Sequence, residues 1–228
     1  MQNKDLKKRI LDISYKLKLS HLGSCLTAID IIDEIYKIKQ SDEKFILSAG
    51  HAHLAHLVVM SKYCLKELES KYKYKHETLG EKYLNEIIEG LIKDYGIHCD
   101  RQAGCDVSTG SLGHGIGIAV GMALADRNKN IYCLISDGEL AEGSVWEALR
   151  IAEAEKLTDL YVYLNNNSWG AYQSTTRYKG IFKFAPRSIK CKKVKTNMND
   201  YPTWLQGQAA HYVVMNEQQY QEALNAIN

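Results

Sequence analysis

The sequence predicts an α/β fold in which a mostly parallel sheet is flanked by helices. Residues 131–135 and 160–164 are apolar with little alternation, as expected for strands that are covered on both faces. The segment between them has one apolar helical face, formed by Val145, Ala148, Leu149 and Ala152. A strand–helix–strand unit of this kind gives parallel strands whose carboxyl ends lie at the same edge of the sheet.

The preceding elements follow in chain order. We expect helices over residues 5–19, 53–68 and 79–95, because apolar residues recur in each at helical spacing. Between the first two, Thr27 is expected to cap a further helix, and residues 45–47 are expected to form a short buried strand.

The glycines that precede the first core strand favour helix packing over nucleotide binding. Gly113, Gly117 and Gly121 recur every four residues, which predicts a helix that packs close to its neighbour. A dinucleotide-binding fingerprint requires G-x-G-x-x-G directly after a strand, and the spacing here is different. A dinucleotide-dependent reductase is therefore disfavoured. In the next helix, Ser144 and Glu147 have the spacing of a capping box.

The composition excludes several classes of partner. The 228 residues include 29 Lys and Arg and 27 Asp and Glu, so no general attraction to nucleic acid or membranes is expected. The lysines between residues 190 and 195 are interpreted as a solvated face. No apolar run approaches the length of a membrane span, and the N-terminal residues lack the apolar core of a signal peptide. We expect a cytoplasmic protein.

Cysteine and histidine patterns do not favour a metal centre. The six cysteines contain no C-x-x-C pair, and we expect reduced thiols, with Cys133 inside the core. His51, His53 and His56 lie close together, but their spacing matches neither His-x-His on a strand nor a pair four residues apart on a helix. Zinc binding by these histidines is therefore not predicted.

Two polar residues follow the two core strands. Asp137 comes directly after the first strand and Asn167 after the second, so both are expected at one edge of the sheet. Mg²⁺ prefers oxygen ligands and takes only one or two carboxylates from protein, with phosphate and water completing its octahedron. Gly138 leaves room for a phosphate to approach the backbone. The alternative is that both segments are ordinary polar turns.

Four segments, in this order, resemble the diphosphate-binding half of transketolases. They are KKRILDISYKLKLSHLGS from residue 7, KFILSAGHA from residue 44, STGSLGHGIGIAVGMALA from residue 108 and SDGELAEGSVWEA from residue 136. The last resembles the thiamine-diphosphate motif of that family, with Ser136 in place of the usual glycine. The resemblance implies a thiamine-diphosphate-binding fold over residues 1–228, with a divergent and shortened part at 175–228.

The resemblance also implies the site residues. Asp137, Asn167 and the carbonyl of Trp169 would hold Mg²⁺. The other positions that correspond to cofactor contacts are His51, Gly110, Ser111, Leu112, Gly138, Glu142 and His211. The histidines expected to face the reacting centre are His21, His51, His98 and His211. Imidazole suits such a role because it exchanges protons near neutral pH.

The implied activity is the transfer of a two-carbon ketol unit from a ketose to an aldehyde or sugar acceptor. The chain corresponds to half of such an enzyme, so a pyrimidine-binding partner subunit is expected, in an α2β2 assembly. In the family, Glu142 and Glu147 correspond to interface glutamates linked to an activating glutamate on the other half. Alternatives are a decarboxylative carboligase of the deoxyxylulose-phosphate-synthase type and a non-catalytic regulatory subunit.

Overall fold

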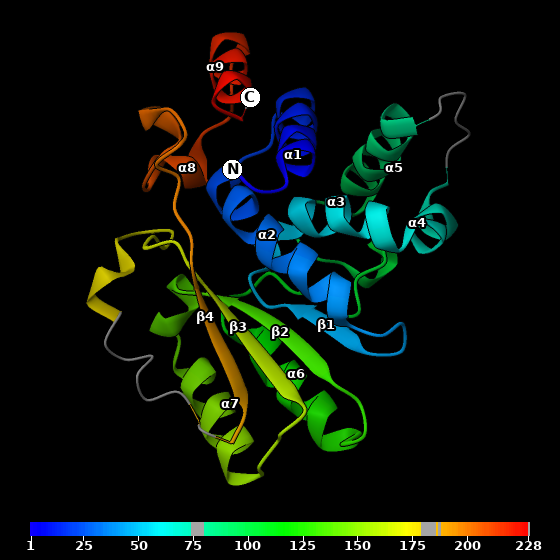
Figure 1. Ribbon diagram of the computed structural model, residues 1–228, viewed down its shortest axis with the longest axis vertical. Helices are drawn as coiled ribbons and strands as arrows, with labels where there is room; N and C mark the ends of the chain where they lie inside the picture. The colour runs from blue at the N-terminus through cyan, green and yellow to red at the C-terminus, as the bar shows by residue number, and fades with distance from the viewer. Residues whose placement is uncertain (74–79, 179–185, 187, 228) are drawn as a thin grey trace.

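A four-stranded parallel sheet forms the centre of the protein (Figure 1). The computed structural model describes residues 1–73, 80–178, 186 and 188–227. The strands are β1 (Lys44–Leu47), β2 (Ile131–Ser136), β3 (Leu160–Asn166) and β4 (Lys190–Lys195), and they lie side by side in this order. Every neighbouring pair is parallel, with Leu47 opposite Leu134 and Ser136 opposite Asn165. The predicted fold class is confirmed.

Helices cover both faces of the sheet (Figure 1). One face is covered by α6 (His114–Ala125) and α7 (Gly143–Ala154). The other is covered by α2 (Leu22–Ile38) and α3 (His53–Tyr63). The elements farther from this second face are α1 (Lys4–Leu17), α4 (Leu65–Lys71), α5 (Gly80–Tyr95), α8 (Ala209–Tyr212) and α9 (Glu217–Ile227).

Successive side chains of β2 enter different cores. Tyr132 and Leu134 pack with α2 and α3, whereas Cys133 and Ile135 pack with α6 and α7. This arrangement explains the continuous apolar run, because both faces of a strand in such a sheet are buried. The core position predicted for Cys133 is confirmed, and all six cysteines are unpaired.

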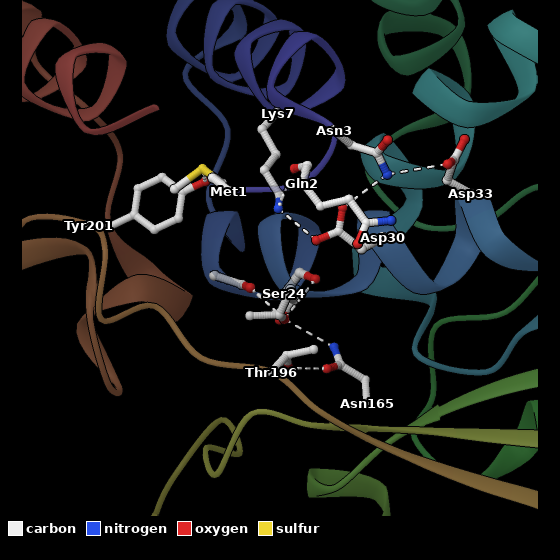
Figure 2. A network of polar contacts seen from close by, with 12 residues as sticks. Met1, Gln2, Asn3, Lys7, Ser24, Asp30, Asp33, Asn165, Thr196 and Tyr201 are labelled. Atoms are coloured by element: carbon white, nitrogen blue, oxygen red, sulfur yellow. Dashed lines mark hydrogen bonds and ion pairs between the residues drawn. The ribbon is translucent and has the colours of Figure 1, made fainter. Parts of the chain in front are cut away.

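Polar contacts fix α1 against α2. The Lys7 ammonium donates a hydrogen bond to Asp30 at 2.6 Å, and the Asn3 amide donates to Asp30 and Asp33 (Figure 2). These contacts hold the start of the chain beside the helix that leads away from His21. Among the described residues, no helix is long and apolar enough to cross a membrane.

The expected starts and ends of several helices differ from the observed ones. The helix expected over 53–68 is interrupted at Cys64, which separates α3 from α4. Thr27 does not cap a helix: α2 already begins at Leu22, and the Thr27 hydroxyl donates a hydrogen bond to the Gly23 carbonyl at 2.7 Å. Leu79, expected as the first residue of a helix, lies outside the described residues.

The lysines of β4 lie at the surface. The lysines from 190 to 195 are exposed, as expected, and they lie on β4, which pairs with β3 at one side of the sheet. Charged side chains are common on such edge strands because they discourage pairing with another chain.

The close packing expected at Gly117 and Gly121 is wrong. Both face open space, since no described atom lies within 4 Å of a Cβ placed there.

Candidate functional site

The carboxyl ends of β2 and β3 bring the predicted metal ligands to one edge of the sheet. The Asp137 amide donates a hydrogen bond to the Asn165 carbonyl at 3.0 Å. Asp137 Oδ2 accepts a hydrogen bond from the Ser168 amide at 2.7 Å, one residue after Asn167. The strand–helix–strand unit therefore places these two chain segments together, as the sequence predicts.

Asp137 has one carboxylate oxygen without a partner. Its side chain is buried, and Oδ2 accepts hydrogen bonds from Ser168 and from the Thr175 hydroxyl. Oδ1 is also buried and has no hydrogen-bond partner within the described residues. Burial raises the pKa of this carboxyl, while its hydrogen bonds act in the opposite direction. A buried oxygen of this kind fits a ligand for a divalent cation.

Asn167 and Trp169 belong to the loop that follows β3. Asn167 Oδ1 accepts a hydrogen bond from the Trp169 amide at 2.9 Å, and its Nδ2 donates to the Thr27 hydroxyl at 3.3 Å. The amide oxygen is therefore turned toward its own loop and keeps a second lone pair. Asn165 also donates to Thr27 and accepts a hydrogen bond from Thr196 (Figure 2). This network fixes the end of β3.

A cavity of about 160 Å³ opens above this edge. Its wall includes nine of the predicted site residues: His21, His51, His98, Gly110, Leu112, Gly138, Asn167, Trp169 and His211. A second hollow, of about 450 Å³, shares Ser24, Asn167, Trp169 and His211 with it. Small-molecule sites commonly occupy about 300–1,000 Å³, so the two adjoining hollows have a suitable size.

The four predicted histidines come together from distant parts of the chain. The ring centroid of His21 lies 4.6 Å from that of His211, 5.6 Å from that of His51 and 6.3 Å from that of His98. Burial, followed by the neighbouring imidazoles, lowers the pKa of His21 to about 4 and that of His51 to about 3. Burial also lowers the pKa of His98 and of His211. These shifts favour the neutral form of each ring at pH 7.

The C-terminal residues bring His211 into the cavity. The His21 amide donates a hydrogen bond to the His211 carbonyl at 2.9 Å, across a separation of 190 positions. Gly23 permits this approach, because a Cβ there would lie 2.6 Å from the Ala210 Cβ. The Tyr212 hydroxyl donates to the Ala171 carbonyl and so joins α8 to the loop after β3.

Three predicted site residues do not line the cavity: Ser111, Asp137 and Glu142. Ser111 is exposed, whereas Asp137 lies buried beside Gly138, which does line it. Glu142 is the half-exposed residue that precedes α7. The predicted capping box does not form: α7 begins at Gly143, the side chain of the preceding Glu142 makes no capping hydrogen bond, and the Ser144 hydroxyl donates instead to the Gly113 carbonyl at 3.2 Å.

Glu139 is an organising residue that the sequence did not reveal. It is fully buried and accepts hydrogen bonds from the Ser48 hydroxyl, the Gly113 amide and the Ser136 amide. Burial raises its pKa, and these donors oppose the shift. One carboxylate thus joins Ser48 after β1, Gly113 at the start of α6 and Ser136 at the end of β2. A charged residue directly after an Asp-Gly turn was the only available signal.

Two glycines at the start of α6, Gly113 and Gly115, allow close internal packing. A Cβ on Gly115 would lie 2.5 Å from the Ser48 Cα, and one on Gly113 would lie 2.4 Å from the Ser144 hydroxyl oxygen. The protein's own atoms therefore fill the space beside these two glycines, which argues against the binding of a dinucleotide phosphate there.

A family model described as 1-deoxy-D-xylulose-5-phosphate synthase, for the N-terminal part of that enzyme, matches residues 2–227. The chain belongs to this family of transketolase and deoxyxylulose-phosphate-synthase N-terminal domains. Transketolase from Homo sapiens is 33% identical over 165 residues, which cover 66% of this chain and 24% of the human protein. One of the subunits of an apulose-4-phosphate transketolase from Phocaeicola vulgatus is 31% identical over 186 residues, which cover 73% of this chain and 60% of that protein.

Solved structures of this transketolase-like domain share the fold. The transketolase of Campylobacter jejuni matches with a TM-score of 0.69 and 19% identity, over 96% of this chain and 41% of that one. The match to a transketolase mutant from Pichia stipitis has a TM-score of 0.70 and covers 97% of this chain and 40% of that one. The chain spans less than two thirds of the length of each of these relatives.

Proposed function

We propose that this chain is the diphosphate-binding subunit of a split, thiamine-diphosphate- and Mg²⁺-dependent transferase of the transketolase type. The observation that carries the proposal is the buried Oδ1 of Asp137, which has no hydrogen-bond partner among the described residues and lies at the sheet edge beside a cavity walled by four histidines. A hard cation needs an oxygen of this kind, and a carbonyl substrate needs proton donors and acceptors close by.

The metal would be held by Asp137 Oδ1, by Asn167 through its second lone pair, and by the Trp169 carbonyl. Gly138 would lie against the diphosphate, and Gly110, Ser111 and Leu112 against the ring portions, with Glu142 nearby. When bound, thiamine diphosphate supplies a nucleophilic carbon for a substrate carbonyl.

The histidines provide proton transfer at the substrate hydroxyl and carbonyl oxygens. A neutral imidazole carries one N–H donor and one acceptor nitrogen, so the group can both give and take a proton. His21, His51 and His211 lie within 6 Å of one another by ring centroid, close enough to contact one small substrate. Their depressed pKa values keep the acceptor nitrogens available at neutral pH.

A partner subunit would complete the site. The Phocaeicola vulgatus relative is named as one of the subunits of a transketolase, which supports a two-chain enzyme here as well. The partner would bind the pyrimidine ring of the cofactor, and two copies of each chain would assemble. The isolated chain would then bind cofactor weakly and show little turnover.

A decarboxylative carboligase is the second candidate, because the matching family model is described as a deoxyxylulose-phosphate synthase. The two reactions differ in the donor: a ketose in one and a 2-oxo acid, which releases CO₂, in the other.

Calorimetric titration of the chain with its partner tests the proposal. We expect thiamine diphosphate to bind only with Mg²⁺ present, and NADPH not to bind. Binding of NADPH, or thiamine diphosphate binding that ignores Mg²⁺, would overturn it. Assays with a ketose donor and with a 2-oxo acid then separate the two reactions, and cofactor binding without turnover of either donor would indicate a regulatory role.

A further inference from the structure

A second group of histidines and cysteines lies in the core, apart from the cavity. It consists of His53 and His56 on α3, and of Cys99 and Cys105, which flank the short helical turn Arg101–Ala103. All four side chains are buried, with exposed fractions between 0% and 6%. Neither the transketolase resemblance nor the proposed function gives these residues a role.

His53 is the residue that points to a ligand. It is 0% exposed, and neither Nδ1 nor Nε2 has a hydrogen-bond partner in the described part of the chain. Buried polar atoms in native proteins are nearly always paired, so two unpaired nitrogens on one ring require an explanation. The ligand atoms of His53, Cys99 and Cys105 all lie within 4.8 Å of one another.

His56 is the nearest residue that could supply a fourth ligand, although it lies outside the set of ligand atoms that are all within 4.8 Å of one another. Its Nδ1 lies 3.5 Å from Cys105 Sγ and 3.8 Å from Cys99 Sγ. With Zn–S of about 2.3 Å and Zn–N of about 2.0–2.1 Å, the sulfur–nitrogen edge of a tetrahedron is about 3.6 Å. The other nitrogen, Nε2, lies 2.7 Å from the Tyr36 hydroxyl, which is the outer contact that a metal-bound imidazole typically makes.

The chemistry of the donors selects the metal. Two thiols and two imidazoles without a carboxylate favour zinc over magnesium, calcium or manganese, which prefer oxygen ligands. A disulfide between Cys99 and Cys105 would give His53 no partner. A tetrahedral ion would engage one of the two His53 nitrogens together with both sulfur atoms.

We propose that His53, Cys99 and Cys105 bind one Zn²⁺ in a structural site, and that the His56 ring moves toward His53 to supply the fourth ligand. The ion would fasten the loop between Cys99 and Gly110 to α3. That loop begins beside His98 and ends at Gly110, both of which line the cavity. The same loop is also joined to β1 through the Thr109 hydroxyl, which donates to the Leu47 carbonyl at 2.6 Å. Zinc would thus stabilise one wall of the cavity without taking part in the reaction.

Metal analysis of the full chain tests this proposal directly. The protein is expressed with added zinc, purified without chelators and measured by inductively coupled plasma mass spectrometry. We expect about one zinc per chain, and loss of this zinc in Cys99→Ser and in Cys105→Ser. Cys64→Ser is the matched control, because Cys64 lies at the end of the same helix outside the cluster, and it should retain the metal. Cobalt in place of zinc should give the thiolate charge-transfer absorption of a tetrahedral site.

Three results would overturn the proposal. One is wild-type protein that holds no zinc after reconstitution, a measurement that does not depend on the folding of any variant. Another is a Cys99–Cys105 disulfide, detected by peptide mass spectrometry, in freshly purified wild-type protein. The third is zinc that persists in both cysteine variants. None of these results bears on thiamine diphosphate binding, so the two proposals fail independently.

Discussion

Two groups of histidines in the protein have different surroundings. His21, His51, His98 and His211 face a cavity, and their neighbours are mainly glycines, polar side chains and one another. His53 and His56 lie in the core among cysteines and aromatic rings. His51 and His53 are only two residues apart, yet they belong to different groups.

The difference arises where a helical turn begins. His51 belongs to the short turn Gly50–Ala52 after β1, whereas His53 is the first residue of α3. Residues two positions apart on a helical turn project in different directions, so His51 lines the cavity whereas His53 is buried in the core. Imidazoles beside a cavity can exchange protons with a substrate, whereas enclosed imidazoles suit permanent ligation.

The largest effect is expected at Asp137, the proposed metal ligand at the sheet edge beside the cavity. Asp137→Asn should weaken Mg²⁺-dependent thiamine diphosphate binding by more than about 100-fold, because the only anionic metal ligand is removed. Calorimetry with the partner present measures the affinity. Asp42→Asn, at an exposed residue paired with Lys129, is the control and should bind normally.

The same variant separates binding from folding. The pKa of Asp137 is raised in the fold, so the ionised carboxylate destabilises the metal-free protein at pH values above that pKa. Metal-free Asp137→Asn should therefore unfold at the same or a higher temperature than wild type at pH 7. A clearly lower unfolding temperature would show that Asp137 has a structural role instead.

The next largest effect separates His51 from His53. His51→Gln should lower the activity of the assembled enzyme by about 100-fold, as expected for a group that transfers protons, and should leave the zinc content unchanged. His53→Gln should lose the zinc and lower the unfolding temperature. Activity assays, metal analysis and calorimetric melts on both variants measure these outcomes. Identical behaviour of the two variants would remove the distinction between the two groups.

A smaller effect is expected at Glu139, which accepts a hydrogen bond from Ser136 in the wall of the cavity. Glu139→Gln should lower the free energy of unfolding by about 1–3 kcal/mol, because an amide nitrogen would face donors that now bond to a carboxylate oxygen. Denaturant unfolding measures the change. Glu155→Gln, at an exposed residue paired with Arg127, should change it little. An unchanged free energy of unfolding in Glu139→Gln would mean that these hydrogen bonds do not stabilise the fold.

The smallest effect is a pH dependence of the protein's stability that arises from His21 and His51. The pKa values of His21 and His51 are lowered to about 4 and about 3, below an unfolded value of about 6.5. Their contribution to stability is therefore fully present above about pH 6.5 and is lost as the pH falls toward those values. Denaturant unfolding of His51→Gln should show a shallower loss between pH 6 and pH 4 (roughly the range between these values). The exposed His114→Gln should behave as wild type.

Much of the site was predictable because it depends on local patterns. The ends of β2 and β3 lie together because a crossover between parallel strands has a fixed geometry, and so Asp137 and Asn167 could be placed at one edge. His21 and His51 were predicted from the resemblance of their segments to transketolase motifs. Glu139 was missed because its donors come from residues 48, 113 and 136, which no local pattern connects.

The sequence by itself determined the parallel sheet, its two covered faces and the edge at which the polar residues meet, because apolar periodicity and crossover geometry act over short stretches of chain. Tertiary packing alone decided that β4 completes the sheet, that His211 approaches His21, and that Cys99 and Cys105 lie beside His56. These contacts join residues that are far apart along the chain. Their formation depends on how whole elements fill the core, which side-chain spacing along the chain does not encode.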